Sequence, residues 1–251
     1  MGIIADRVIA VRTNKAVYRD GETVLKVFVE STPAASVMRE AMNQAAADEA
    51  GFPVPSLCEV TRMDGKWVIR SRYIRGKNLR QLMEAEPART SEYIDLLVRV
   101  QTELHGSREK QLVRMQDDMA RRIRNAELAS EYKDAFLHKL EEMPESDTFC
   151  HGGLSPSNLL ISADDGQPYI LDWANAVRGD AAADAAMTYV LLQMHDTTGI
   201  QSREYLKTYC GRSGLASSDV LGYVPAAAGT IMTKNNENDP ILQKFIFGGI
   251  P

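Results

Sequence analysis

The first part of the chain alternates short runs of β-branched and apolar residues with polar turns. Runs of this kind predict strands, and Asp20-Gly21 and Asp64-Gly65 are typical of the turns between paired strands. The predicted strands cover residues 8–13, 16–19, 23–29, 56–62 and 66–73. We therefore expect a small sheet in this part of the chain.

A helical pattern interrupts the predicted strands. Pro33 suits the first turn of a helix and Gly51 suits its exit, so a helix is predicted between them. Its expected apolar stripe consists of Met38, Met42, Ala45 and Ala46. The sheet is thus expected to carry one helix.

The pattern changes after Gly76, where helical periodicity dominates. A broad apolar face on the second helix of this part indicates that it is buried. Two short strand signals lie within the helical part, at residues 159–161 and 169–171, and they flank a polar turn that predicts a β-hairpin. The predicted helices cover residues 78–84, 91–105, about 112–143, and a stretch from residue 181 onward.

These two patterns together predict an α+β fold. The chain has 251 residues, which is enough for one large domain or for two lobes around a shared cleft. We expect a small, β-rich N-lobe over residues 1–74 and a larger, helical C-lobe over residues 75–251.

Composition and charge disfavour several classes of protein. Hydrophobic residues make up 44% of the chain and charged residues 25%, as in a globular protein with a sizeable core. The net charge of −5 disfavours a dedicated nucleic-acid binder. There is no signal-peptide pattern, no apolar run of membrane-spanning length and no CxxC motif among the three cysteines. We expect a cytoplasmic protein with reduced thiols and no membrane or nucleic-acid partner, and its oligomeric state stays open.

Lys26 lies mid-strand among apolar residues, in the segment VLKVF. An ammonium there could point into a cleft and bind phosphate oxygens, although most such lysines lie on the solvated face of a strand. Glu40, about two turns into the predicted helix, could pair with Lys26, and Glu49 near the end of the helix is the competing candidate. Neither residue alone identifies a site.

Two polar residues flank the predicted hairpin. Asn158 follows a tight, glycine-containing loop, HGGLSPSN, and Asp172 ends the apolar strand of ILDW. The hairpin would bring their side-chain oxygens to the same end, and hard cations such as Mg²⁺ prefer oxygen ligands. The pair therefore predicts a magnesium site, whereas Asp172 alone is equally consistent with a strand-end cap.

These segments resemble the aminoglycoside phosphotransferase and choline kinase-like family, which has the protein-kinase-like fold. The family pattern reads approximately HGDxxPxN, then a hydrophobic run with DW, then GDPxxD. Two segments of this chain match that pattern, CHGGLSPSNLL and ILDWANAVRGDAAADAAMTY. Four earlier segments also resemble family segments and follow the family's order: LKVF, MREAMNQAAADEAGFPVPSL, VIRSRYIRGKNLRQLM and ELHG. The resemblance covers most of residues 8–192 and implies a two-lobed fold. Its N-lobe would cover a nucleotide, and its C-lobe would carry the catalytic loop and the acceptor site.

The resemblance also implies how ATP would be held. Lys26 would bind the α- and β-phosphates, and Glu40 would pair with Lys26. A turn at residues 13–16 would cover the phosphates, although it lacks the G-x-G-x-x-G pattern that protein kinases have. The backbone of an interlobe hinge would contact adenine, and this hinge consists of Arg72, Tyr73 and Ile74.

Four further residues receive roles from the resemblance. Asn158 and Asp172 would hold Mg²⁺ beside the phosphates and so belong to the catalytic set. His151 would brace the loop rather than act chemically, and Asp184 would stabilise the same loop.

The chain departs from the family pattern at Gly153, which stands where the family's HGD has an aspartate. In the family that aspartate accepts the hydroxyl proton and orients the acceptor. General-base catalysis contributes about 10²–10⁴-fold to a rate, so its loss should slow the reaction without abolishing ATP binding. Gly153 could be a substitution that disables the enzyme, the mark of a natural pseudokinase, or a position whose task another carboxylate or a water performs.

The leading hypothesis is an ATP-dependent phosphotransferase that transfers the γ-phosphate to a hydroxyl of a small molecule, with ATP and Mg²⁺ as cofactors and with impaired activity. The alternative is a nucleotide-binding pseudokinase with a regulatory or scaffold role. A protein kinase is disfavoured because HRD, DFG and APE are absent. Acidic residues of the C-lobe would suit an amine-bearing acceptor, but they are more simply explained as surface charges.

Overall fold

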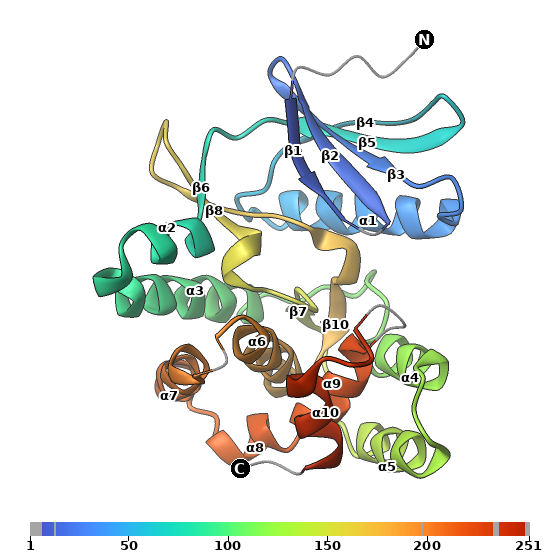
Figure 1. Ribbon diagram of the computed structural model, residues 1–251, viewed down its shortest axis with the longest axis vertical. Helices are drawn as coiled ribbons and strands as arrows, with labels where there is room; N and C mark the ends of the chain where they lie inside the picture. The colour runs from blue at the N-terminus through green and yellow to red at the C-terminus, as the bar shows by residue number, and fades with distance from the viewer. Residues whose placement is uncertain (1–6, 13, 197, 233–235, 249–251) are drawn as a thin grey trace. The chain divides into compact units, whose positions relative to one another are not determined.

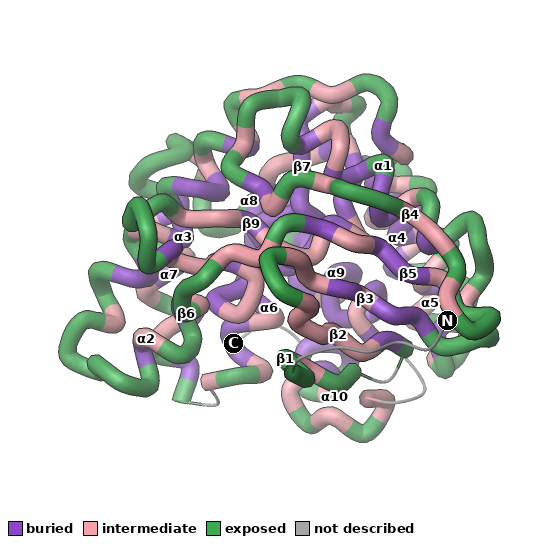
Figure 2. Tube along the Cα trace, turned by 90° about the horizontal axis from the view of Figure 1, so that it is seen from above, coloured by how far each residue is buried: buried purple, intermediate pink, exposed green. Residues whose placement is uncertain are grey.

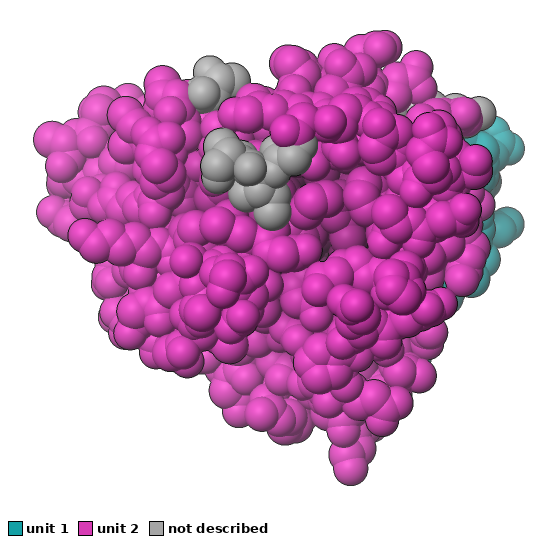
Figure 3. All heavy atoms as spheres, turned by 90° about the horizontal axis from the view of Figure 1, so that it is seen from below, with its two compact units in different colours: residues 1–79, 157–175 teal, residues 80–156, 176–251 magenta. Residues whose placement is uncertain are grey.

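A computed structural model describes residues 7–12, 14–196, 198–232 and 236–248 of the chain. The chain forms two compact units. Unit 1 consists of Met1–Leu79 and Ser157–Asn175, and unit 2 consists of Arg80–Pro156 and Ala176–Pro251 (Figure 3). Strands dominate unit 1 and helices dominate unit 2, so the predicted α+β class is confirmed.

The main sheet of unit 1 has five antiparallel strands. They are β1 (Arg7–Val11), β2 (Lys15–Asp20), β3 (Thr23–Phe28), β4 (Leu57–Met63) and β5 (Lys66–Arg72). Their order in the sheet is β1-β2-β3-β5-β4 (Figure 1). Gly21 and Gly65 have positive φ angles in the two turns predicted from the sequence, a conformation that glycine adopts without a Cβ clash. The five predicted strands are present, with ends that differ by one or two residues.

Helix α1 (Ala34–Glu49) packs against this sheet (Figure 1). Val37 and Ala41 of the helix belong to one buried cluster with Phe28 and Ile69 of the sheet. Pro33 directly precedes the helix, as its pattern predicts.

The apolar stripe predicted for α1 is wrong. Met38 and Met42 are 36% and 67% exposed, whereas Glu40 is only 2% exposed. Asn43 and Gln44 are buried as well, and both donate hydrogen bonds to backbone carbonyl groups of unit 1. Hydrophobicity therefore misplaces the inward face of this helix, because polar side chains with buried partners occupy it.

A smaller sheet also belongs to unit 1. Its strands β6 (Gly76–Asn78), β8 (Leu159–Ser162) and β9 (Pro168–Ile170) pair antiparallel in the order β6-β8-β9. Glycine is required at Gly76, because a Cβ there would lie 2.1 Å from the carbonyl oxygen of Ile161. These pairings group residues 157–175 with unit 1, whereas the division expected from the sequence assigns them to the C-lobe. The domain boundary at residue 74 stays a prediction.

Helices make up most of unit 2. They are α2 (Leu79–Ala85), α3 (Thr90–His105), α4 (Met115–Asn125), α5 (Ser130–Glu141), α6 (Ala181–His195), α7 (Ile200–Ser213), α8 (Ser217–Leu221), α9 (Val224–Ile231) and α10 (Pro240–Phe247), with a 3-10 turn at Pro87–Arg89. Helix α6 is buried along most of its length, and α7, α8, α9 and α10 pack around it (Figures 1 and 2). Among the described helices, none is long and apolar enough to cross a membrane.

The helical stretch predicted at about residues 112–143 consists of two helices, α4 and α5. Ala126 ends α4 because its backbone is extended, with φ of −72° and ψ of 152°. The side-chain amide of Gln116 then joins the two helices by donating to the carbonyl groups of Leu140 and Met143. A periodic apolar pattern that continues on both sides of a short break does not reveal the break.

Two very short strands were not predicted. β7 (Thr148–Cys150) pairs antiparallel with β10 (Val177–Gly179) in unit 2. Each has three residues, which is too few to show an alternating pattern. Their pairing positions the loop that follows β7, which contains His151, Gly152 and Gly153.

Candidate functional site

Lys26 and Glu40 meet inside unit 1. Lys26 lies in β3, opposite Val17 of β2 and Ile69 of β5. Its ammonium forms an ion pair with the carboxylate of Glu40, whose side chain is 3% exposed. Glu49, the competing candidate, lies exposed at the end of α1. The structure thus brings together the lysine and the glutamate that the sequence singles out, and their roles toward a nucleotide stay predictions.

The environment of Lys26 favours its charged form. Burial by itself lowers the pKa of Lys26, but the negative charges of Asp172 and Glu40 and their hydrogen bonds raise it above the ordinary value of 10.5. The Nζ atom lies 3.5 Å from Oδ1 of Asp172. Lys26 is therefore an ammonium at neutral pH and is suited to bind an anion.

Asn158 and Asp172 lie at the same end of the β8–β9 hairpin. Asn158 ends a 3-10 turn, Pro156–Asn158, directly before β8, and its carbonyl accepts a hydrogen bond of 2.8 Å from the N–H of Leu171. Asp172 comes next in the chain. The hairpin thus places the backbones of the two predicted ligands together, as the spacing indicates.

Asp172 has an unusual backbone conformation. Its φ is 64°, a left-handed value that costs about 1–3 kcal/mol for a residue with a side chain. The only other described residue of this kind, apart from glycines, is Asp64 in the β4–β5 turn. Strain of this kind persists where the surrounding structure enforces it and is frequent at functional sites. The carboxylate of Asp172 and the side-chain amide of Asn158 are oxygen donors of the type that Mg²⁺ prefers, so these residues fit a magnesium ion.

A second lysine faces the same two carboxylates, and no sequence pattern singles it out. Nζ of Lys15 lies 2.7 Å from Oδ1 of Asp172 and 3.3 Å from both carboxylate oxygens of Glu40. Lys15 belongs to the segment 13–16 that is predicted to cover the phosphates, of which Thr13 lies outside the described residues. Its place in that segment is one signal that could have found it. The register of the predicted β2–β3 hairpin is another, because it places Lys15 on the same face as Lys26.

The predicted hinge has two N–H groups that are already bonded within unit 1. Arg72 donates its backbone N–H to the carbonyl of Ser56 at 3.0 Å, and Tyr73 donates to the carbonyl of Glu22 at 2.8 Å. The N–H of Ile74 has no partner among the described residues. The hydrogen bonds within the fold therefore leave the N–H of Ile74 as the candidate donor among these three groups.

In unit 2, Asp184 of α6 holds the loop that follows β7. Its Oδ1 accepts a hydrogen bond of 2.7 Å from the backbone N–H of Gly152. Its Oδ2 accepts from Nε2 of Gln101 at 3.0 Å and from Nε2 of His105 at 2.9 Å. Burial raises the pKa of Asp184, but the hydrogen bond and charge of His105 and the bond from Gln101 outweigh it, so the pKa lies below 3.8. Asp184 is an ionised brace, as the resemblance implies.

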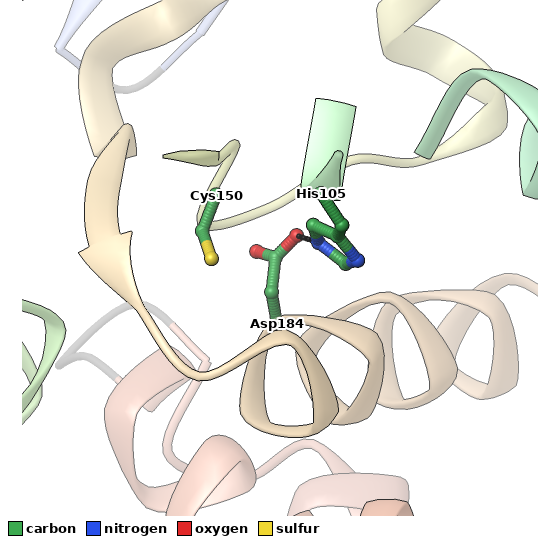
Figure 4. Close-up of side chains that lie close together, drawn as sticks. All are labelled: His105, Cys150 and Asp184. Carbon is green, nitrogen blue, oxygen red and sulfur yellow. Dashed lines mark hydrogen bonds and ion pairs between the residues drawn. The ribbon is translucent and has the colours of Figure 1, made fainter. Parts of the chain in front are cut away.

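His105, Cys150 and Asp184 point toward one another from α3, β7 and α6 (Figure 4). Their possible metal-ligating atoms lie within 4.8 Å of one another. Hydrogen bonds account for the group, since His105 binds both Asp184 and the hydroxyl of Tyr209. Burial, together with the negative charge of Asp184, raises the pKa of the Cys150 thiol well above 9.0. Because His105 and Asp184 are already engaged in these hydrogen bonds and Asp184 also holds Gly152, the group is described as a structural brace.

Gly153 lies buried in the same loop. It is not among the glycines of positive φ, whereas its neighbour Gly152 has φ of 72°. The φ angle of Gly153 is therefore one that a residue with a side chain can adopt. Two aspartates of unit 2 are engaged in hydrogen bonds, since Asp184 accepts three of them and Asp180 caps α6 through the N–H groups of its first turn.

Comparison with known proteins identifies the family. The family model described as phosphotransferase enzyme family matches residues 6–221. The chain belongs to this phosphotransferase family. The resemblance drawn from the sequence motifs is thereby confirmed. No curated protein sequence matches the chain.

Solved structures of distantly similar proteins show the same fold. An aminoglycoside-3'-phosphotransferase of type VIII has 19% identity and a TM-score of 0.63 over 91% of this chain and 93% of its own. A thermostable mutant of aminoglycoside phosphotransferase APH(4)-Ia, in ternary complex with ADP and hygromycin B, has 13% identity and a TM-score of 0.66 over 98% and 94%. The microcompartment-associated aminopropanol kinase has 16% identity and a TM-score of 0.60 over 94% and 87%. The predicted kinase-like fold class is thereby confirmed.

Proposed function

We propose that this phosphotransferase transfers the γ-phosphate of ATP to a hydroxyl group of a small molecule. The observation that carries the proposal is the convergence of Lys26, Glu40 and Asp172 in unit 1 of a chain that belongs to a phosphotransferase family. Phosphoryl transfer depends mainly on positioned phosphates and on positive charge that offsets the developing negative charge. A charged lysine held by a buried glutamate supplies one of these requirements.

The proposed nucleotide contacts follow from the donors of unit 1. The Lys26 ammonium binds the α- and β-phosphate oxygens, and Glu40 keeps it extended toward them. The N–H of Ile74 donates to adenine, because the N–H groups of Arg72 and Tyr73 are engaged in the fold. Arg72 and Tyr73 then contribute to the adenine site through their carbonyl groups or by shaping the backbone.

The proposed magnesium ligands are Asp172 and Asn158. Bound Mg²⁺ would neutralise phosphate charge and orient the γ-phosphate for in-line attack. Asp172 offers a partly exposed carboxylate, and its left-handed backbone turns the chain at the end of the hairpin. Asn158 offers an amide oxygen from the adjoining strand entry.

The proposed acceptor is an amine-bearing alcohol or an amino sugar. Its support comes from the relatives, one of which is an aminopropanol kinase and another of which is in complex with hygromycin B. A screen of acceptors of these two kinds would assign the substrate.

Gly153 favours a second candidate function, a nucleotide-binding pseudokinase. The chain has no carboxylate at the family's base position, and Asp180 and Asp184 are held by their own hydrogen bonds. A water could deprotonate the acceptor only slowly. Nucleotide binding without turnover would then serve a regulatory or scaffold role.

A thermal-shift titration with ATP, with and without Mg²⁺, tests the proposal. A ligand that binds the folded state raises the melting temperature by mass action. We expect a magnesium-dependent rise for the wild type and its loss in Lys26→Ala, with Lys66→Ala as the control because Lys66 is exposed at the start of β5. Multiple-turnover ADP release with an acceptor would support the enzyme, and binding without turnover would support the pseudokinase. No shift at millimolar nucleotide would contradict both.

A further inference from the structure

Two lysines share the carboxylates of Glu40 and Asp172, and the proposed function uses only one of them. Lys15 is 8% exposed, so its ammonium is largely withdrawn from water. Its Nζ lies 2.7 Å from Oδ1 of Asp172 and 3.3 Å from each carboxylate oxygen of Glu40. A buried lysine is tolerated when it is paired, so these two acids account for the position of Lys15.

The strand register puts the two lysines side by side on one face of the sheet. Val17 lies opposite Lys26, and Lys15 lies opposite Phe28. Residues two positions apart share a face of a strand, so Lys15 and Lys26 are diagonal neighbours. The Lys15 ammonium also lies 5.9 Å from the centre of the Phe28 ring. Both ammonium groups therefore approach the same acids from adjacent strands.

Asp172 is held more closely by Lys15 than by Lys26. Its Oδ1 is 2.7 Å from Nζ of Lys15 and 3.5 Å from Nζ of Lys26. The positive charges of Lys15 and Lys26 equal in number the negative charges of Glu40 and Asp172 with which they pair. A dication on either oxygen of Asp172 would lie close to the Lys15 ammonium, and these like charges repel each other. Phosphate oxygens would offset that repulsion.

We propose, on the basis of the proposed function, that Lys15 is a second phosphate-binding cation that couples magnesium binding to nucleotide binding. Without nucleotide, Lys15 binds Asp172 and opposes the metal. With nucleotide, Lys15 donates to phosphate oxygens and leaves the Asp172 carboxylate to Mg²⁺. Lys26 stays paired with Glu40 in both states. Lys15 alone therefore changes partner when the nucleotide binds.

Calorimetric titrations of the full chain test this coupling. The titrants are MgCl₂ alone, ADP alone, and MgCl₂ in the presence of ADP. Removing the Lys15 charge by Lys15→Met should tighten binding of Mg²⁺ alone by about tenfold or more and weaken binding of ADP alone by a similar factor. Lys15→Arg, which keeps the charge, should retain the opposition to metal, and Lys66→Met controls for the loss of one positive charge.

The wild type supplies a measurement that does not depend on whether a variant folds. ADP should tighten binding of Mg²⁺ by about tenfold or more, and independent binding of the two would overturn the role of Lys15. If Lys15→Met behaves like the wild type while Lys26→Met loses ADP, the inference fails and the proposed function stands. If the wild type binds no ADP, both fail.

Discussion

Glu40 and Lys26 form an ion pair between helix α1 and strand β3, and the glutamate side chain is 3% exposed. The carboxylate of Glu40 is therefore stabilised by its lysine partners rather than by contact with water. Removing one member of a buried pair leaves an uncompensated charge, which costs about 3–5 kcal/mol. The pair is consequently a structural element of unit 1 as well as a candidate phosphate-binding device.

Glu40→Gln is expected to lower the free energy of unfolding by about 3 kcal/mol, because it leaves Lys15 and Lys26 with Asp172 as their remaining acidic partner. Urea denaturation at neutral pH measures the change. Glu49→Gln is the matched control, since Glu49 lies exposed on the same helix and should alter stability little. Equal stabilities of the two variants would contradict a structural role for the pair.

Gly153→Asp is expected to raise phosphotransfer by at least about tenfold, because it restores a carboxylate at the family's base position. The φ angle of Gly153 is not positive, so the backbone accepts the change without left-handed strain. Initial rates of ADP release with a turned-over acceptor measure the gain. Gly153→Asn has nearly the same shape without a basic carboxylate, and an equal gain in that variant would show that general-base catalysis is not the cause.

The sequence segments predict the positions of the candidate site residues better than the apolar periodicity predicts the buried face of α1. Lys26, Glu40, Asn158 and Asp172 lie where their segments indicate, because a strand, a helix and a hairpin have fixed geometries. The apolar stripe of α1 fails because Glu40 has to be buried beside Lys26. Pattern analysis assumes that burial follows hydrophobicity, and a buried ion pair breaks that assumption.

Two features of the site depend on pairings that no local pattern shows. That Lys15 shares a face with Lys26 becomes visible only when the register of β2 with β3 is known. The N–H groups of Arg72 and Tyr73 donate to the carbonyl groups of Ser56 and Glu22, which are distant in sequence. Only the structure therefore shows that Ile74 is the remaining candidate N–H donor of the hinge. Long-range hydrogen bonds of this kind are a property of the fold rather than of a segment.

Asp184→Asn is expected to destabilise the protein by more than about 2 kcal/mol at pH 7, because the carboxylate accepts three buried hydrogen bonds. The pKa of Asp184 is below 3.8 in the folded state, so its stabilisation is complete above that value and declines as the pH falls through the folded pKa. The difference in the free energy of unfolding between wild type and variant should therefore be constant from about pH 7 to 5 and should become smaller below about pH 4. Urea denaturation across this range measures it, with the exposed Asp117→Asn as control. A difference that persists at acid pH would contradict the ionised brace.

Two of the three cysteines, Cys58 and Cys150, are expected to differ in reactivity toward a thiol reagent such as Ellman's reagent. Cys58 is exposed, whereas Cys150 is buried and the pKa of its thiol is raised well above 9.0 by burial and by the charge of Asp184. Because only the thiolate reacts, Cys58 should account for the fast phase in the folded protein, and Cys150 should react after unfolding. Cys58→Ser should remove the fast phase.

The group of His105, Cys150 and Asp184 is expected to be a brace rather than a metal site, so added Zn²⁺ should leave the melting temperature of the protein unchanged. A rapid reaction of Cys150, or stabilisation by Zn²⁺ that His105→Gln abolishes, would show instead that this group binds metal.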